Sequence, residues 1–296
     1  MSTAIDIHTK TEVLLEALPY VQAFRGSTFV VKVGGSFMEA EEAQRSVAGD
    51  LVFLAAIGIR VVVVHGGGKA ISRAMEAANI PPVFRSGLRV TDGATVSIVE
   101  RTLNTEINAS VVRYLQDKTG LATGVFGQDV FRVETLREDS DGNPLDVGFV
   151  GRVVHVKPYE VEAHLAAGRI PVVSPVGMDT SGQFHNVNAD AAAAALAGAL
   201  KARRLVFLCD VPGLLRDPKD PSTIISTLHV GEVAALRQAG VIGSGMLPKV
   251  ESGVAALHEG VRRVHFIDGR LAHSLLLEIF TDEGIGTEIV SGQDAP

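Results

Sequence analysis

Cysteine is almost absent from this sequence. Of its 296 residues only Cys209 is a cysteine, which excludes an internal disulfide. Cys209 lies in the apolar run LVFLC, where a thiol usually packs as a small hydrophobic side chain. We therefore interpret Cys209 as structural rather than reactive.

Long hydrophobic runs are missing as well. Hydrophobic residues make up 46% of the chain, yet they occur in short runs, far below the roughly 18 consecutive apolar residues that span a bilayer. The first residues, MSTAIDIHTKTEVLLEAL, lack the basic start and apolar core of a secretory signal, and their acidic residues are atypical of a transit peptide. We expect a cytoplasmic protein without a membrane span.

Excess positive charge is also lacking. The formal net charge is −7, and no dense basic run is interleaved with aromatic residues, as in many nucleic-acid-binding proteins. The sequence therefore predicts no nucleic acid partner. A local cationic pocket for a small anion is compatible with this composition.

Strand-like and helix-like segments alternate along most of the chain. Short apolar runs read as strands buried on both faces, and segments with helical periodicity separate them. This alternation is typical of parallel strands joined by crossover helices. The expected strands are Thr28–Val33, Arg60–Val64, Arg169–Val173, Arg204–Cys209 and Arg262–Ile267. The expected helices are Glu39–Ile57, Lys69–Asn79, Ala94–Lys118, Tyr159–Ala167, Ala189–Ala202, Gly231–Gln238 and Pro248–His258.

The region from Leu121 to Val156 departs from this pattern. Its strand-like segments have no helix between them and surround the polar loop REDSDGNPLD, which predicts a hairpin or ribbon standing on the sheet rather than part of its core. The length of the chain favours two lobes. Residues Ser174–Asn188 are rich in turn formers and mark the expected boundary, with a cleft between two α/β lobes.

Two of the expected strands end in glycine clusters, TFVVKVGGS and RVVVVHGGGKA. Glycine lets the backbone approach a ligand closely, and the N-terminus of a following helix attracts anions. Either cluster alone would read as an ordinary tight turn, but two on neighbouring parallel strands favour an anion-binding floor. The spacing fits neither a P-loop nor a dinucleotide fingerprint, because Val63 and Ile71 stand where those motifs need glycine.

Two lysines are candidate anion ligands. Lys32 interrupts an apolar strand just before its glycines, and a buried ammonium needs a partner, which would be either a bound anion or an internal carboxylate. Lys249 follows Gly243, Ser244, Gly245 and Pro248 near an expected helix start, where a positive charge is unfavourable unless an anion binds. A solvated surface lysine is the alternative for Lys249.

Three further polar segments are candidates. Asn186 to Asp190 precede an expected helix, so they would cap it, although a carboxylate there could also fix the two lysines. Asp210 ends an expected strand before a Pro-Gly turn, a common place for nucleotide contacts. Arg89, in SGLRVTD, could bind a carboxylate bidentately through two nitrogens of its guanidinium group, or form a surface ion pair.

Six motifs in this order, VKVGGS, VVVVHGGGKAI, SGLRVTD, NVNADAAAAALA, LCDVPGLL and GSGMLPKV, closely resemble those of the acetylglutamate kinases of the amino acid kinase superfamily. The resemblance covers nearly the whole chain. It implies an α/β fold, an open αβα sandwich with a mainly parallel central sheet and two lobes. Residues 26–185 would form the N-acetyl-L-glutamate-binding lobe and residues 186–296 the ATP-binding lobe.

The same resemblance implies the activity and the site. The enzyme would transfer a phosphoryl group from ATP, with Mg²⁺ carried on the nucleotide and no metal bound by protein ligands, to the γ-carboxylate of N-acetyl-L-glutamate. Lys32 and Lys249 would neutralise the transferred group, and Asp190 would orient both lysines. The remaining implied contacts are Gly34 and Gly35 for phosphate; Gly67, Gly68, Arg89 and Asn186 for substrate; and Asp210, Val211, Gly213, Leu215 and Gly243 for the nucleotide.

Regulation is implied by both ends of the chain. Residues 1–25 resemble the N-terminal helix by which arginine-inhibited members assemble hexamers as trimers of dimers; a helix packed on its own lobe is the alternative, and Pro19 is expected to kink it. The segment HSLLLEIFTDEGIGTEIV resembles the feedback site for L-arginine, with Glu278, Gly284 and His265 as candidate contacts. Whether a PII-type signalling protein binds is left open.

Two other functions stay open at this level. One is a catalytically silent arginine sensor that keeps the fold, against which the presence of both lysines and Asp190 weighs. The other is a kinase for a different acidic amino acid or its carrier-bound form. Departures from the family pattern at Thr105 and at Gly124–Asp129 leave room for an altered acyl preference.

Overall fold

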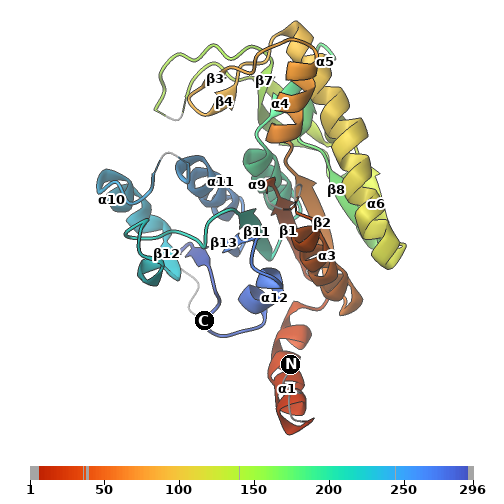
Figure 1. Cartoon of the computed structure of the whole chain (residues 1–296), viewed down its shortest axis with the longest axis vertical. Helices are drawn as coiled ribbons and strands as arrows, with labels where there is room; N and C mark the ends of the chain where they lie inside the picture. Colours follow the sequence, from red (N-terminus) through yellow and green to blue (C-terminus); the bar gives the residue numbers. More distant parts are fainter. Residues whose placement is uncertain (1–6, 36, 38–39, 140, 244, 293–296) are drawn as a thin grey trace.

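The computed structural model describes residues 7–35, 37, 40–139, 141–243 and 245–292 (Figure 1). Eight of the described strands form one sheet in the order β12-β14-β13-β11-β1-β2-β8-β5. Neighbouring strands are parallel except β13 and β14, so the predicted mainly parallel sheet is confirmed. The strands are β1 (Thr28–Val33), β2 (Arg60–His65), β5 (Ala122–Val125), β8 (Ile170–Val173), β11 (Arg204–Cys209), β12 (Thr227–His229), β13 (Arg263–Asp268) and β14 (Thr287–Val290).

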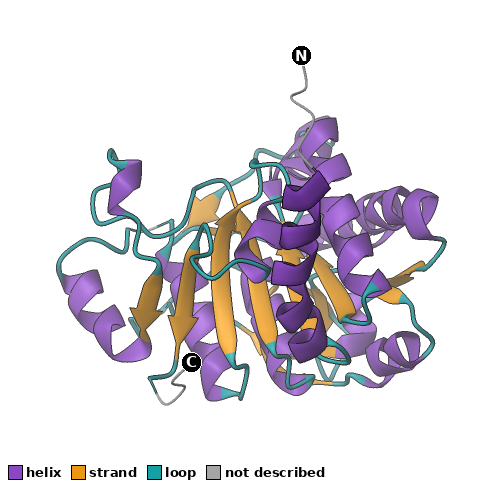
Figure 2. Ribbon diagram, turned by 90° about the horizontal axis from the view of Figure 1, so that it is seen from below, coloured by secondary structure: helices purple, strands orange, loops and turns teal. Residues whose placement is uncertain are grey.

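Helices cover both faces of this sheet (Figure 2). Successive strand residues point to opposite faces, and in β1 Val30 packs in one hydrophobic cluster while Val31 packs in the other. The layers therefore form the predicted αβα sandwich. The main helices are α3 (Glu41–Ala56), α4 (Gly68–Ala77), α8 (Tyr159–Ala166), α9 (Ala189–Ala199), α10 (Val233–Gln238), α11 (Leu247–His258) and α12 (Ser274–Ile279).

The expected helix Ala94–Lys118 is present but is not regular. It consists of α5 (Gly93–Arg101), a π-helical segment (Thr102–Ile107) and α6 (Asn108–Thr119). A π-helical turn inserts an extra residue and rotates the following side chains, and such turns often occur at functional sites. Leu103 and Ile107 of this segment are buried and lie against the second glycine cluster, as described below.

The expectation for residues 121–156 was partly wrong. Residues Ala122–Val125 do not stand on the sheet: they form β5, its edge strand. A short helix, α7 (Gly127–Val130), also intervenes. The following strands β6 (Phe131–Thr135) and β7 (Val150–Val156) do pair as a ribbon, and with β9 (Val176–Met178) and β10 (Phe184–Val187) they close a small four-stranded barrel. The four residues Ala122–Val125 are too short a segment to show the strand–helix alternation of the rest of the sheet, because they directly follow the preceding helix.

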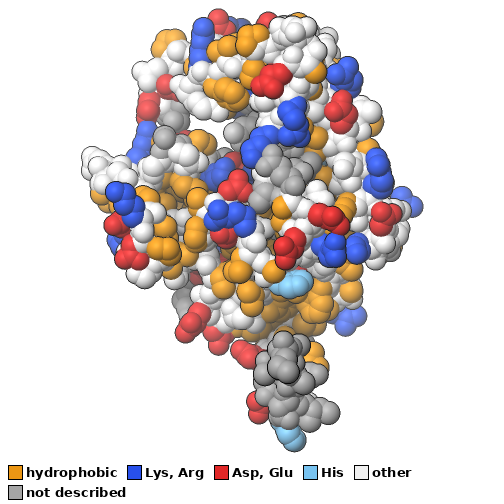
Figure 3. All heavy atoms as spheres, in the orientation of Figure 1, with side chains coloured by type: hydrophobic (Ala, Val, Ile, Leu, Met, Phe, Trp, Pro, Cys, Tyr) orange, Lys and Arg blue, Asp and Glu red, His pale blue; other side chains and the backbone are white. Residues whose placement is uncertain are grey.

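A second small sheet, β3 (Phe84–Arg85) and β4 (Leu88–Arg89), forms a hairpin above the main sheet (Figure 1). Figure 3 shows a hollow between this region and the side of the molecule that carries α10 and α11. Ser86 and Leu88 line that hollow on one side, and Pro248 and Glu251 line it on the other.

The N-terminal helix α1 (Ile7–Phe24) projects from the body of the molecule (Figures 1 and 3). Its last residue, Phe24, packs edge-to-face against Phe29 and Phe280, which anchors this end of the helix. Leu14 is 73% exposed. Among the described helices, none has the length and hydrophobicity needed to cross a membrane.

Candidate active site

Three charged side chains meet at the carboxyl edge of the sheet. Lys32 comes from β1, Asp190 from the first turn of α9 and Lys249 from the first turn of α11. The Nζ atoms of Lys32 and Lys249 each lie 2.8 Å from a different oxygen of the Asp190 carboxylate. Asp190 is 5% and Lys32 9% exposed, and buried charges of this kind require each other. The three groups together carry one net positive charge, which suits an incoming anion.

The protonation of this cluster follows from competing effects. Burial is the largest influence on the Asp190 carboxyl and opposes its ionisation, but Lys32 and Lys249 together outweigh it, so the pKa of Asp190 lies below its ordinary value. Burial likewise opposes the charge of Lys249, and the Asp190 carboxylate outweighs it, so the pKa of Lys249 is raised. Asp190 and Lys249 are therefore both charged at neutral pH.

The start of α9 fixes the position of Asp190. The Asn188 side chain accepts hydrogen bonds from the backbone N–H groups of Asp190, at 2.8 Å, and Ala191, at 3.2 Å, which is the N-cap arrangement. A carboxylate in the first turn also suits the helix dipole. The segment NVNAD thus does both things expected of it: Asn188 caps the helix while Asp190 pairs with the lysines.

The two glycine clusters lie side by side beneath these charges. β1 and β2 are adjacent and in register at Val33 and His65, and Gly66 N–H donates to the Val33 carbonyl at 2.8 Å. A Cβ atom added to Gly35 would lie 2.6 Å from Asp210 Oδ2, and one added to Gly34 would lie 3.0 Å from Lys32 Nζ. A side chain at either position would crowd the Lys32 ammonium or the Asp210 carboxylate, whereas glycine leaves these charged groups close to the backbone. Ser36 of the first cluster lies outside the described residues.

Gly67 and Gly68 form the start of α4. A Cβ atom on Gly67 would lie 2.5 Å from Ile107 Cδ1 and 2.6 Å from Leu103 Cδ2, whereas one on Gly68 would meet nothing within 4 Å. The π-helical segment therefore packs directly against Gly67. The first turn of a helix directs backbone N–H groups out of its N-terminus, so the start of α4 favours an anion.

His65 is a neutral side chain that contacts the second glycine cluster at Gly66. It is fully buried, and burial lowers its pKa to about 4. Its Nδ1 lies 2.9 Å from the Gly66 carbonyl and Nε2 lies 3.3 Å from Asn108 Nδ2. Because a carbonyl only accepts, Nδ1 carries the proton and Nε2 accepts from the amide of Asn108. The arrangement holds Gly66 without adding charge to the site.

Arg89 lies at the other side of the same cavity. Its Nη2 donates to the Gly68 carbonyl at 2.7 Å and to Ser72 Oγ at 2.9 Å, and Nη1 lies 3.2 Å from Met75 Sδ. The Phe84 ring covers the guanidinium at 4.8 Å, and burial lowers its pKa. Among the described residues no carboxylate pairs with Arg89, so the surface ion pair considered from the sequence is absent there.

Arg89, Lys32 and Asp190 line one cavity, which has a volume of about 240 Å³. Asn186 lines it from β10, and its amide donates to Thr91 Oγ1 at 3.4 Å. Asn188 also lines it, and its remaining walls are apolar side chains or glycines, including Ile71, Leu88, Leu103, Val150 and Gly87. Such a cavity, with cationic groups and apolar walls, suits a small anionic molecule that has an apolar part.

The residues expected to contact a nucleotide lie in two loops beside the lysines. Asp210, Val211, Gly213 and Leu215 follow β11, and Gly243 precedes α11. Asp210 helps to raise the pKa of Lys249, which places it near the charge cluster. The Gly243 carbonyl accepts from Met246 and Leu247 N–H, both at 3.0 Å, and so shapes the turn into α11. Ser244 lies outside the described residues.

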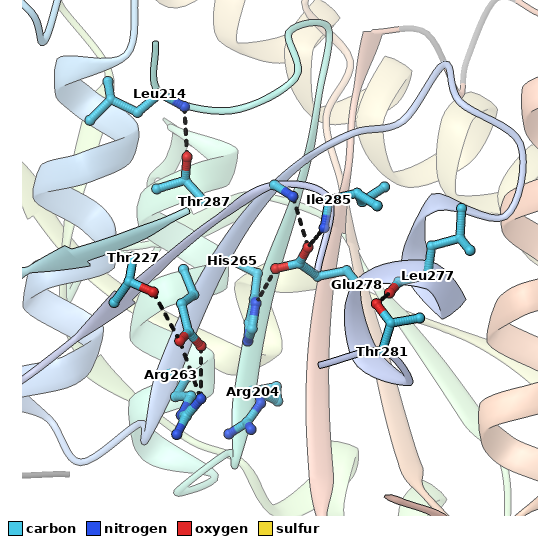
Figure 4. Close-up of polar contacts among 12 residues, drawn as sticks. Arg204, Leu214, Thr227, Arg263, His265, Leu277, Glu278, Thr281, Ile285 and Thr287 are labelled. Atoms are coloured by element: carbon cyan, nitrogen blue, oxygen red, sulfur yellow. Dashed lines mark hydrogen bonds and ion pairs between the residues drawn. The ribbon is translucent and has the colours of Figure 1, made fainter. Parts of the chain in front are cut away.

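The three residues expected at an effector site also lie together, and Figure 4 shows two of them, His265 and Glu278. His265 Nδ1 is 2.7 Å from Glu278 Oε1, and Glu278 Oε2 accepts from the N–H groups of Ile285, at 2.7 Å, and Gly286, at 2.9 Å. Burial opposes ionisation of Glu278, but His265 and these N–H groups outweigh it and lower its pKa. Gly284, with φ +61°, lies so close that a Cβ there would be 2.9 Å from Glu278 Oε2. This site is separate from the lysine cluster.

In the part of the chain that the structure describes, no three His, Cys, Asp or Glu side chains are grouped as metal ligands would be. Both oxygens of Asp190 already face lysines. The donor set therefore fits a phosphate-bound cation better than a cation held by protein carboxylates.

Sequence reasoning did not identify several residues that shape these sites. His65, Asn108 and Ser72 position the glycine loop and Arg89, and Thr287 contacts the loop after β11. The sequence did offer a clue for His65, which lies between a buried strand and a run of glycines. Ser72 and Thr287 gave no signal, because their partners are distant in the sequence or belong to the backbone.

Comparison with known proteins agrees with this geometry. The model of the amino acid kinase family matches residues 27–268. Acetylglutamate kinase from Akkermansia muciniphila is 46% identical over 286 residues, covering 96% of each chain. Acetylglutamate kinase from Synechocystis is 47% identical over 287 residues, covering 97% of this chain and 95% of the relative.

A solved structure of N-acetylglutamate synthase from Neisseria gonorrhoeae, in complex with coenzyme A and N-acetyl-glutamate, superimposes with a TM-score of 0.81 at 28% identity. The match covers 97% of this chain and 64% of the synthase. The same synthase in complex with coenzyme A and L-arginine gives a TM-score of 0.78. The fold, the site and the full-length relatives agree: this chain belongs to the amino acid kinase family, together with the acetylglutamate kinases.

Proposed function

We propose that this protein transfers a phosphoryl group from MgATP to the γ-carboxylate of N-acetyl-L-glutamate, giving N-acetyl-L-glutamyl 5-phosphate in cytoplasmic arginine biosynthesis. One observation carries the proposal. Arg89, a buried arginine without a carboxylate partner among the described residues, lines the same cavity of about 240 Å³ as Lys32 and Asp190, and the Asp190 carboxylate is shared by Lys32 and Lys249. A dicarboxylate in that cavity would meet a cation at each end.

The lining of the cavity suggests the orientation of the substrate. The α-carboxylate would bind Arg89, with Asn186 beside it, and the γ-carboxylate would accept from the backbone N–H groups of Gly67 and Gly68. The apolar walls, such as Leu103 and Val150, suit the methylene groups and the acetyl methyl group. Neutralising the amino group by acetylation also removes a charge for which this apolar lining offers no partner.

The chemistry then needs no general base. A γ-carboxylate oxygen attacks the γ-phosphorus of ATP, a new O–P bond forms, the bond to the β,γ-bridging oxygen breaks, and ADP leaves without any proton transfer. Catalysis reduces to alignment and to stabilising negative charge on the transferred group. Lys32 and Lys249 supply the positive charge that stabilises it. Asp190 fixes the separation of the two lysines, and Gly34 and Gly35 offer N–H groups to phosphate. Mg²⁺ bound to the nucleotide would supply further neutralisation of the phosphate oxygens.

The proposal also divides the chain. Residues 26–185 would bind N-acetylglutamate and residues 186–296 would bind ATP, with Asp210, Val211, Gly213, Leu215 and Gly243 lining the nucleotide site. Lys32 comes from the first part, while Asp190 and Lys249 come from the second, so the charge cluster would join the two ligands at the place of transfer.

Feedback inhibition by L-arginine is the regulatory part of the proposal. A guanidinium suits the buried carboxylate of Glu278, and His265 and the backbone at Gly284 lie beside it. The structural likeness to a synthase solved with L-arginine supports this idea. The exposed apolar side chains of α1 support a hexamer, a trimer of dimers, in which residues 1–25 contact another copy.

The direct test is trapping of the acyl phosphate with hydroxylamine. ATP is supplied with N-acetyl-L-glutamate, and in parallel with L-glutamate, L-aspartate or N-acetyl-L-aminoadipate, each with and without L-arginine. We expect hydroxamate preferentially from N-acetyl-L-glutamate, with less formed when arginine is added. Hydroxamate mainly from another acid would reassign the substrate. No acyl phosphate from any acid, with arginine still bound, would instead support a silent sensor.

A further inference from the structure

Thr287 connects two sites that are far apart in the sequence (Figure 4). It is the first residue of β14 and is fully buried. Its Oγ1 accepts a hydrogen bond from the backbone N–H of Leu214 at 2.8 Å. Leu214 is itself buried, and a buried backbone N–H requires an acceptor. The hydroxyl of Thr287 therefore holds the loop that runs from Asp210 to Leu215.

The same loop is fitted closely to Thr287. A Cβ atom added to Gly213 would lie 2.7 Å from Thr287 Oγ1 and 3.1 Å from its backbone nitrogen. The φ angle of Gly213 is +156°, a conformation that L side chains rarely adopt. Gly213 thus lets the loop lie directly on Thr287, and the loop cannot shift without losing the hydrogen bond of Leu214.

The other side of Thr287 adjoins the Glu278 site. Gly286, the preceding residue, and Ile285 both donate their N–H groups to Glu278 Oε2. Gly286 is packed tightly on β13, because a Cβ there would lie 2.3 Å from the Phe266 carbonyl. Ile285 and Gly286, the two residues before β14, are therefore held by Glu278. Thr287, the first residue of β14, holds the Leu214 loop (Figure 4).

We propose that Thr287 is a positioning residue that holds the nucleotide loop and ties it to the turn fixed by Glu278. A cationic ligand that takes the Glu278 carboxylate would release Ile285 and Gly286, loosen the start of β14, and so lower the affinity for ATP. This inference rests on the proposed function of the loop and of Glu278. By linkage, ATP must weaken the binding of that cation by the same factor.

The positioning role is tested with Thr287→Val, which keeps the branched shape and strand preference but removes the acceptor. We expect the KM for ATP and the Kd of a non-hydrolysable ATP analogue to rise about three- to ten-fold, as for the loss of one hydrogen bond. The KM for N-acetylglutamate should stay within about two-fold. Thr287→Ser should restore ATP affinity because it restores the hydroxyl.

Thr227→Val is the matched control. Thr227 lies on β12 beside β14, and its hydroxyl donates to Glu288 at the surface, at 3.5 Å. The control should bind ATP like the wild type. An unchanged Kd for the ATP analogue in folded Thr287→Val would overturn the proposal. So would Thr287→Ser failing to restore affinity, or both Michaelis constants rising equally, since these indicate general damage.

The tie to Glu278 is tested by a double-mutant cycle of Thr287→Val with Glu278→Gln, measured as the Kd of the same analogue. Glu278→Gln should weaken binding on its own, and its effect should shrink once Thr287 is valine, because the two share one connection. Additive effects would refute the tie. Analogue binding does not depend on phosphoryl transfer, so absence of kinase activity in the wild type would count against the proposed function and leave this test intact.

Discussion

Asp190 lies between two ammonium groups from different parts of the chain, and its ionisation is coupled to the stability of the fold. Its pKa is lower in the folded chain than the ordinary value of 3.8. The charged carboxylate therefore stabilises the fold fully above that ordinary value, and the contribution is lost as pH falls through the lower folded value. Asp190→Asn should lower the free energy of unfolding by about 2 kcal/mol at pH 7, less than for a fully buried pair because the Lys249 side chain is 24% exposed.

Urea unfolding at several pH values measures this. The difference between wild type and Asp190→Asn should be constant above pH ~5 and shrink below pH ~4. Asp268→Asn is the matched control, since Asp268 pairs with the exposed Arg270 at 2.7 Å and should contribute less than about 1 kcal/mol. Equal losses in the two variants, or a difference that grows in acid, would contradict the role given to Asp190.

Ser72 is a second residue whose importance comes from its neighbour. It accepts from Arg89 Nη2 and donates to the Gly68 carbonyl at 3.1 Å, so it fixes the distance between the arginine and the first turn of α4. That distance must match the length of the dicarboxylate. Ser72→Ala should raise the KM for N-acetylglutamate about five-fold, leave the KM for ATP unchanged, and reduce discrimination against N-acetyl-aspartate.

Steady-state kinetics with both acids would check this, with Ser97→Ala as the control. Ser97 forms the same kind of helical bond, to the Gly93 carbonyl at 3.5 Å, but among the described residues it accepts no hydrogen bond from an arginine. If Ser97→Ala changed the same constants, or if Ser72→Ala raised the KM for ATP instead, Ser72 would not be a specific support of Arg89.

At the scale of elements, the contact between α4 and the π-helical segment predicts an asymmetry between two adjacent glycines. Gly67→Ala would place a methyl group against Leu103 and Ile107, whereas Gly68→Ala has open space. Overpacking of this kind costs about 1–3 kcal/mol, so Gly67→Ala should lower the Tm by several degrees. Thermal unfolding of the two variants side by side measures the difference. A Gly68→Ala variant that is equally destabilised would show that the contact with the π segment is not the cause.

The elements that could be predicted from the sequence are those with a local signal. Buried runs such as Thr28–Val33 coincide with β1 because β-branched residues filled both faces. The π-helical turn at Thr102–Ile107 could not be predicted, because its apolar spacing fits an ordinary helix and the extra residue is accommodated by packing on Gly67. Strand β14 is only four residues long, and its place beside β13 is decided by tertiary contacts.

The candidate site followed the same rule. Lys32 was identifiable because a charge in an apolar strand needs a partner, and Lys249 because it stands near an expected helix start. The roles of Arg89 and Asp190 came mainly from the resemblance to a family. The structure brings both lysines and Asp190 into contact. The sequence could not predict which lysine contacts which oxygen of Asp190, nor that Met75 and Ser72 contact Arg89. These contacts depend on side chains whose local sequence pattern is ordinary. The roles assigned to all of these residues stay predictions.

At the scale of the whole molecule, α1 leaves an apolar surface without a cover in this single chain. Val13, Leu14, Leu15 and Leu18 are exposed, Leu14 by 73%, which is typical of a surface that another copy covers. If α1 joins copies in the proposed hexamer, Leu14→Asp should reduce the assembly to smaller species and lower its sensitivity to arginine. Deletion of residues 1–25 should do the same.

Light scattering and arginine titration measure these effects, and Tyr159→Asp is the control. Tyr159 is 77% exposed but stands alone at the start of α8 rather than in an apolar stripe. A truncated chain that stayed hexameric and equally sensitive to arginine would contradict the assembly proposed for α1.

The order of strands has a consequence for synthesis on the ribosome. β1 is first in the sequence but central in the sheet: it pairs with β2 on one side and with β11 on the other. Arg204 of β11 is made about 170 residues after Val33 of β1, which at ~5–20 residues per second takes roughly 10 to 35 seconds. During that time a nascent chain that has paired β1 with β2 still presents an open, highly apolar edge. Newly made chains should therefore depend on chaperones until β11 emerges, even though the finished sheet leaves β1 no free edge.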